Sequence, residues 1–146
     1  MAKAKPKPKK PKRLSYSAHV TKAKEVWRQS VLYMHQDEYG FCKCVTCGVR
    51  RAPNDPHMHC GHFIHARNNV YFMLLCVRPQ CSRCNGYMKG RPREYASFIA
   101  NHHGPKILAW LLEQSKIRHD FTRAFLDRII EDSRTIIRQY GAKPCR

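Results

Sequence analysis

The sequence predicts an α+β protein that is helical for most of its length and contains a small zinc-stapled core. Two Cys-X-X-Cys pairs, Cys44 with Cys47 and Cys81 with Cys84, indicate the core, because thiolates at this spacing are typical of structural zinc sites. On both sides of these pairs, apolar residues recur every three or four positions, which is the period of an amphipathic helix. A chain of 146 residues is expected to form one domain with some tail.

The first element is a basic tail, predicted to be disordered over residues 1–18. Its first 13 residues contain no acid and no large apolar residue except Met1, so burial cannot repay the entropy of ordering them. An N-terminal helical unit is predicted over residues 19–40, with the helix between residues 21 and 38 and Gly40 as its stop. The predicted buried stripe of this helix is Ala23, Val26, Trp27, Ser30, Val31 and Met34.

The zinc-stapled core is predicted over residues 41–104. A turn marked by Pro53 and Pro56 separates the first Cys-X-X-Cys knuckle from a short strand that ends at Ile64. The apolar run over residues 70–77 is predicted to be a second strand that precedes the second knuckle. A short helix over residues 93–103 follows, and Gly104 with Pro105 ends it.

A C-terminal helical unit is predicted over residues 105–146. Its first helix spans about residues 106–115 and its second about residues 120–140, with Gly141 as the C-cap of the second. The predicted apolar stripe of the long helix is Phe121, Phe125, Ile129, Ile136 and Tyr140.

The four paired cysteines are predicted to hold one structural Zn²⁺ that closes the intervening loop of residues 48–80. Cys42 competes with Cys44 as a ligand because both lie in Cys42-Lys43-Cys44. Gly48 favours the tight turn that Cys44 and Cys47 require. The remaining cysteines are predicted to be free or buried thiols: Cys60, Cys76 and Cys145.

The net charge of the chain indicates what kind of molecule it binds. The chain carries 28 Lys and Arg against 10 Asp and Glu, a formal charge of +18, so a polyanion such as nucleic acid is expected to bind. No stretch approaches the roughly 20 apolar residues that span a bilayer, and the N-terminus has no apolar signal region, so neither a membrane partner nor export is expected. Paired cysteines without an export signal favour metal ligation in a reducing cytoplasm.

The order of the motifs resembles a known family. The elements are Cys44-X-X-Cys47-Gly48, then Gly61-His62-Phe63-Ile64, then Arg78-Pro79-Gln80-Cys81-X-X-Cys84-Asn85. Together they are similar to the NinG family of phage recombination proteins and, more distantly, to the HNH or ββα-metal nucleases, which include phage endonuclease VII. The similarity covers roughly residues 27–104. It implies an HNH-like ββα-metal core and a metal-dependent DNA endonuclease that hydrolyses phosphodiester bonds in recombination or DNA processing.

The resemblance also assigns site residues. It implies that His62 is the general base and that Asn85 is a ligand of a catalytic Mg²⁺ or Mn²⁺. Where endonuclease VII-like sites have an acid this chain has Gly61, and where NinG-like sequences have an Asp it has His59. In an extended strand His59 and Gly61 share one face, so His59 is predicted to replace the missing acid and to favour softer ions.

The remaining predictions concern the DNA substrate, the cellular location and the residues that contact phosphate. Branched or junction DNA is a candidate substrate, in the cytoplasm of a phage-infected bacterium, and paired cuts across a junction would need two active sites, as in a homodimer. A non-catalytic zinc protein that binds nucleic acid is the alternative, and Gly61 and Cys76 lend it weight. The predicted phosphate contacts are Arg67, Arg78, Lys89, Arg91 and Arg93.

Overall fold

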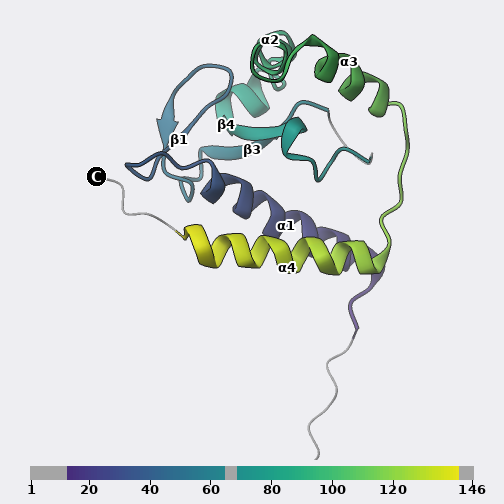
Figure 1. Cartoon of the computed structure of the whole chain (residues 1–146). Helices are drawn as coiled ribbons and strands as arrows, with labels where there is room; N and C mark the ends of the chain where they lie inside the picture. Colours follow the sequence, from purple (N-terminus) through teal and green to yellow (C-terminus); the bar gives the residue numbers. More distant parts are fainter. Residues whose placement is uncertain (1–12, 65–68, 142–146) are drawn as a thin grey trace, which may run out of the picture.

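A computed structural model describes residues 13–64 and 69–141 (Figure 1). The predicted tail up to residue 12, the phosphate contact Arg67, and Cys145 lie outside this part of the chain. Among the described residues, no helix is both long and apolar enough to cross a membrane. In chain order the elements are α1 (Tyr16–Met34), β1 (Cys42–Lys43), β2 (Arg50–Arg51), β3 (Met58–His62), η1 (Leu74–Cys76), β4 (Val77–Cys81), η2 (Arg83–Tyr87), α2 (Pro92–His103), α3 (Pro105–Gln114) and α4 (Arg123–Tyr140).

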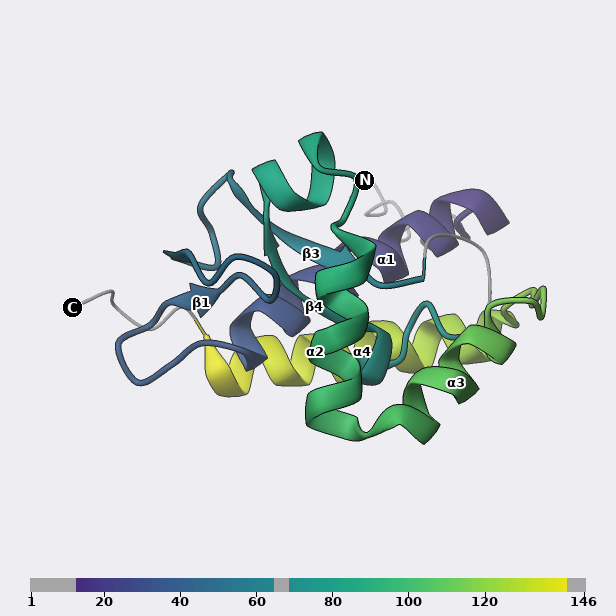
Figure 2. The ribbon, with the colours of Figure 1, turned by 90° about the horizontal axis from the view of Figure 1, so that it is seen from above.

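These elements form layers around one antiparallel ribbon, β3–β4. Helices α2 and α3 lie on one side of the ribbon, and α1 and α4 lie on the other (Figures 1 and 2). Strand pairing sets His59 opposite Gln80 and Gly61 opposite Arg78, while the shorter pair β1–β2 forms the base of the first knuckle. The mixture of helices with small sheets agrees with the predicted α+β class.

Helix α1 begins earlier and ends earlier than predicted. Ser15 caps its N-terminus by accepting a hydrogen bond from the backbone N–H of Ala18 at 3.2 Å, so the last residues of the predicted tail are helical. The helix ends at Met34, before Gly40, which instead allows a turn with a φ of 83°. Five residues of its predicted stripe are buried, Ala23, Val26, Trp27, Ser30 and Val31, whereas the sixth, Met34, is half-buried.

The predicted strand over residues 70–77 is wrong. The backbone N–H of Met73 donates to Val70 and that of Cys76 donates to Met73, so this apolar run forms turns and the strand β4 starts only at Val77. The consecutive side chains of Tyr71 and Phe72 both pack into the core beneath α1. A strand sends consecutive side chains to opposite faces, so it could not bury both there.

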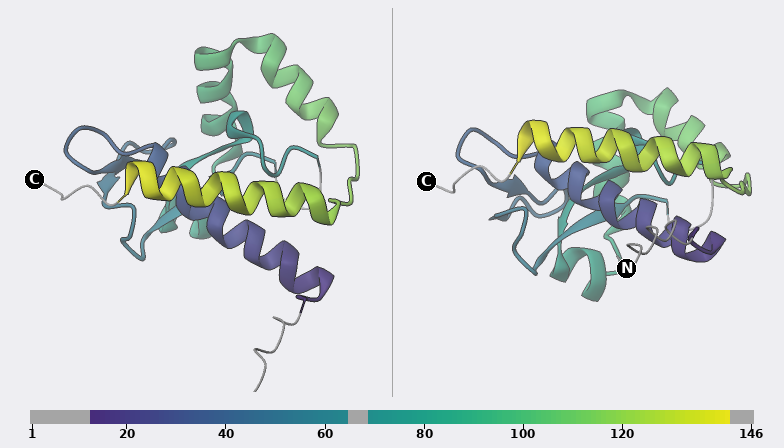
Figure 3. Two further views of the ribbon diagram at one scale, coloured as in Figure 1. Left: turned by 60° about the horizontal axis from the view of Figure 1, so that its bottom comes forward. Right: turned by 90° about the horizontal axis from the view of Figure 1, so that it is seen from below.

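Helix α4 packs against α1, and the two helices run side by side in the same direction (Figure 3). The Tyr16 hydroxyl donates to the carbonyl of Phe121 at one end of the pair, and the Gln36 amide donates to the carbonyl of Gly141 at the other. The predicted stripe of α4 is partly wrong, because Phe125 and Tyr140 are exposed. Thr122 caps the helix, and the residues of α4 that are buried are Leu126, Ile130 and Ser133.

Two apolar clusters flank the ribbon. The first joins α1 and α4 to Cys60, Tyr71 and Val77, and the second joins α2 and α3 to Cys76 and the segment around Ile64. Cys60 and Cys76 are therefore buried thiols, as predicted. The ribbon is held on both faces, which fixes the positions of the residues at its ends.

Candidate metal centres

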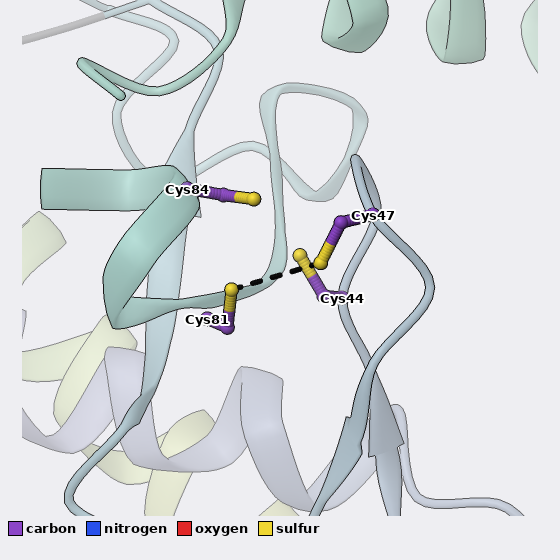
Figure 4. A group of neighbouring side chains, drawn as sticks. All are labelled: Cys44, Cys47, Cys81 and Cys84. Atoms are coloured by element: carbon purple, nitrogen blue, oxygen red, sulfur yellow. Dashed lines mark hydrogen bonds between the residues drawn. The ribbon is translucent and has the colours of Figure 1, made fainter. Parts of the chain in front are cut away.

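The four predicted zinc ligands come together. Cys44 and Cys47 lie on the loop between β1 and β2, Cys81 ends β4, and Cys84 lies in the π-helical turn η2 (Figure 4). Their sulfur atoms all lie within 4.8 Å of one another, and those of Cys47 and Cys81 are 3.7 Å apart. The sulfur–sulfur edge of a zinc tetrahedron with bonds of about 2.3 Å is about 3.8 Å, so the four cysteines could hold this metal.

Local backbone geometry makes the first knuckle. Gly48 adopts a φ of 78° and donates its N–H to the carbonyl of Cys44 at 2.9 Å, which closes the turn around Cys47. Cys42 points elsewhere, because its buried Sγ donates to the carbonyl of Leu32 at 3.0 Å. Within the described residues Cys42 is not part of the cluster, and the ambiguity between Cys42 and Cys44 is resolved in favour of Cys44.

The electrostatics of the cluster favour a bound cation. Burial alone would raise the pKa of Cys44, but hydrogen bonds from Thr46 and from nearby backbone N–H groups outweigh it and lower that pKa to about 6. Burial raises the pKa of Cys47 to about 12 and also raises the pKa of Cys81. One thiolate forms readily, whereas further negative charge on the cluster requires a cation to balance it.

Gln80 links the two knuckles and was not singled out from the sequence. Its amide Nε2 donates to Thr46 Oγ1 at 3.1 Å, beside the first knuckle, and to the carbonyl of Gly90 at 2.7 Å, beyond the second. The same side chain explains Gly61, because a Cβ at position 61 would lie 2.4 Å from Gln80 Oε1. An acid therefore has no room at position 61.

His59 and Asn85, the two predicted ligands of a second metal, lie together at the edge of the ribbon. The Nδ2 atom of Asn85 is 3.3 Å from Nδ1 of His59. On the other side of the ring, Nε2 of His59 is 3.2 Å from the carbonyl of Pro56, which can only accept a hydrogen bond. The proton is thereby placed on Nε2, and the lone pair of Nδ1 faces Asn85.

His62, the predicted general base, lies on the opposite face of the ribbon from His59, as strand alternation predicts. Its side chain is buried, with 9% of its surface exposed, and its ring stacks on Tyr71 at a centroid distance of 4.2 Å. Its Nε2 lies 3.2 Å from the carbonyl of Tyr71, which accepts a hydrogen bond from the ring. The structure does not bring His62 into contact with the pair formed by His59 and Asn85.

The predicted phosphate contacts divide into two groups. Arg78 is half-buried, donates to the carbonyls of Leu74 and Val77, and lies over the Phe98 ring at 5.8 Å. Burial lowers the pKa of its guanidinium. Arg91 donates to Glu94 at 3.0 Å and lies next to the Cys84 sulfur, and these two contacts raise its pKa. Lys89 and Arg93, by contrast, are exposed.

The family relationship follows from comparison with known proteins. The family model described as "Bacteriophage Lambda NinG protein" matches residues 2–142. The chain belongs to the NinG family. This match extends beyond the four-cysteine core to both terminal helices, so the α1–α4 pair is part of the NinG family unit. Neither the curated proteins nor the solved structures gave a match.

Proposed function

We propose that this NinG chain is a metal-dependent DNA endonuclease of the HNH type, acting in phage recombination or DNA processing. The observation that carries the proposal is the pair of His59 and Asn85, with 3.3 Å between Nδ1 and Nδ2, in which Asn85 directly follows Cys84 of the four-cysteine cluster. A β3–β4 ribbon followed by η2 presents this pair at the surface, in a chain whose formal charge is +18. The charge supplies the attraction to DNA.

The donor atoms of this pair fit a divalent cation. Two neighbouring ligands with bonds of about 2.1 Å lie about 3.0 to 3.4 Å apart, which matches the separation of the two side chains. Rotation of the Asn85 amide would exchange Nδ2 for Oδ1 and so present an oxygen beside Nδ1 of His59. The bond from His59 Nε2 to Pro56 is the outer contact that orients metal-binding histidines.

A cation bound there would neutralise the scissile phosphate and stabilise the leaving 3′ oxygen. The protein must also supply a group that accepts a proton from the attacking water. His62 is the candidate by residue type, since an imidazole suits proton transfer near neutral pH, but its ring is buried on the face of the ribbon opposite the pair, so this role requires a movement that brings it to the attacking water. The expected products carry a 5′-phosphate and a 3′-hydroxyl.

Metal dependence tests this assignment. We expect cleavage of branched or linear DNA to require added divalent metal and to be faster with Mn²⁺ than with Mg²⁺, because imidazole favours the softer ion. Asn85→Ala and His59→Ala each remove a direct ligand, so they should raise the metal concentration needed for half-maximal cleavage by more than the about 10- to 100-fold that the loss of an outer contact causes. His59→Asp should move the preference toward Mg²⁺.

Asn101→Ala is the matched control, because Asn101 is exposed on the last turn of α2. It should leave the metal dependence unchanged. Equal metal requirements in Asn85→Ala, His59→Ala and Asn101→Ala would show that the pair binds no catalytic ion.

Salt dependence tests the electrostatic part of the proposal. Deleting residues 2–12 removes six lysines. We expect DNA affinity to fall steeply with salt in the full chain, and the slope of log affinity against log salt to become shallower by about 0.9 for each phosphate that the deleted lysines had neutralised. Fluorescence anisotropy at several salt concentrations measures both slopes. Identical slopes in the two proteins would show that the tail binds no phosphates.

The burial of His62 favours a second candidate, a non-catalytic zinc protein that binds nucleic acid. In that case His62 serves the core by stacking on Tyr71. The absence of cleavage with Mg²⁺, Mn²⁺ and Ni²⁺, in protein that retains zinc and binds DNA, would select this alternative.

A further inference from the structure

The side chain of Tyr87 extends from the turn that follows the second knuckle. It is 88% exposed, far more than its neighbour Met88 at 39%. It ends η2, two residues after Asn85, in the short teal coil between β4 and α2 that projects from the body of the molecule (Figure 2). An aromatic side chain this exposed contributes almost nothing to the core, and its ring is open to a partner.

The backbone that carries Tyr87 is held firmly. The N–H of Met88 donates to the carbonyl of Arg83 at 2.9 Å, and the N–H of Gly90 donates to that of Cys84 at 2.8 Å. Lys89 and Arg91 have φ values of 51° and 48°, and they are the only non-glycine residues with a positive φ in the described part of the chain. A non-glycine residue in this conformation costs of order 1 kcal/mol or more. The conformation persists only where surrounding contacts enforce it, and such residues are concentrated at functional sites.

The surroundings of Tyr87 are cationic. Arg83, Lys89 and Arg93 are all exposed on the same short stretch of chain. The single acid there, Glu94, is already paired with Arg91. Exposed aromatic rings interleaved with cations are the combination that binds nucleic acid with accessible bases, since the ring stacks on a base while the cations hold the phosphates.

We propose that Tyr87 stacks on an unpaired base of the DNA. This base would lie next to the phosphodiester bond that is cut at the His59 and Asn85 pair. In a continuous duplex each base is covered on both faces by its neighbours. The free face that Tyr87 requires occurs at gaps, ends and branches, so this residue would direct the protein to DNA with an exposed base. This inference rests on the proposed function, which supplies DNA as the partner and the phosphodiester bond that is cut beside the stacked base.

The test uses the full zinc-loaded chain without added divalent metal, so that no DNA is cut. The probe is a gapped circular duplex with the fluorescent base 2-aminopurine in the gap, and the fully paired closed circle of the same sequence is the reference, because it has no ends. Wild-type protein should quench the fluorescence in the gap, because an aromatic ring stacked on 2-aminopurine quenches it. Tyr87→Ala should lose the quenching and bind the gapped DNA at least about fivefold more weakly, with no change for the paired duplex.

Two further variants make the result specific. Tyr87→Phe keeps the ring and should keep both the quenching and the affinity. Tyr140→Ala removes another exposed tyrosine, 42% exposed at the end of α4, and should behave as wild type. Because Tyr87 is at the surface, its variants should retain zinc and thermal stability, which checks that the fold is intact.

Equal binding of gapped DNA by Tyr87→Ala and wild type would overturn the proposal, as would the same loss for the paired duplex, which would indicate a general contact. Tighter binding of single-stranded RNA than of gapped DNA would also overturn it in favour of an RNA partner. Stacking without cleavage in any metal would leave this proposal standing and would remove only the endonuclease activity.

Discussion

Loss of zinc should collapse the region from residue 41 to residue 90, and this is the largest effect we expect from any single perturbation. Apart from contacts of the cysteine sulfurs, three hydrogen bonds join the two knuckles in the described part of the chain: Val45 to Pro79 at 3.0 Å, Gln80 to Thr46 at 3.1 Å and Arg91 to Thr46 at 3.4 Å. Each contributes about 1 kcal/mol, whereas binding of structural zinc contributes about 10 to 16 kcal/mol in small zinc domains. The hydrogen bonds cannot replace the metal.

Cys81→Ser is the corresponding substitution, and Cys42→Ser is its control. Cys81→Ser should lower the zinc content and the cooperativity of thermal unfolding, measured by elemental analysis and circular dichroism. Serine at position 42 can still donate to the carbonyl of Leu32, so that variant should keep its zinc. A folded protein that contains no zinc, or zinc lost in Cys42→Ser and kept in Cys81→Ser, would contradict the four-cysteine site.

Substitution of His62 should have the largest effect on activity. His62→Gln keeps a donor that can reach the carbonyl of Tyr71 but lacks a group that titrates near neutral pH. If His62 is the general base, the rate of cleavage should fall by about 10²- to 10⁴-fold, with zinc content and DNA affinity close to wild type. A gel assay of cleavage under single-turnover conditions measures the rate.

His19→Gln is the matched control. His19 is also buried, 2.9 Å from Asp127, but it lies between α1 and α4. Both variants are expected to lose some stability, so their unfolding temperatures should be compared alongside their rates. A similar small loss of rate in the two variants would mean that His62 only stabilises the core. That result would favour the non-catalytic alternative.

The four-cysteine cluster was predictable because its signal is local. A Cys-X-X-Cys turn followed by Gly48 specifies its own geometry, and two such turns need only one metal to join them. The alternation of His59 and His62 across β3 was predictable for the same reason, since a strand has a fixed period of two residues. Ser15 and Thr122 also carried cap signals that would have placed the starts of α1 and α4.

The remaining features depended on packing that a sequence does not reveal. A continuous apolar run such as residues 70–77 fits a strand, a helix or a buried turn, and the two cores on either side of the ribbon decided for turns. The buried face of α4 differs from the predicted one. Leu126 and Ile130 join the core that α4 shares with α1, whereas the predicted Phe125 does not. The role of Gln80 could not be foreseen, because the groups it bonds, Thr46 and Gly90, are distant in the chain.

The parallel pairing of α1 with α4 sets the order in which the chain assembles during synthesis. The first and last helices are joined by contacts such as Tyr16 to Phe121, between residues 105 positions apart. The ribosome releases the knuckles and the β3–β4 ribbon well before α4, so the core around the four cysteines can form while Trp27 and its neighbours still lack the cover that α4 supplies. The C-terminal helix acts as the closing segment of the fold, and a nascent chain that stalls before residue 123 would expose an apolar surface open to aggregation or to a chaperone.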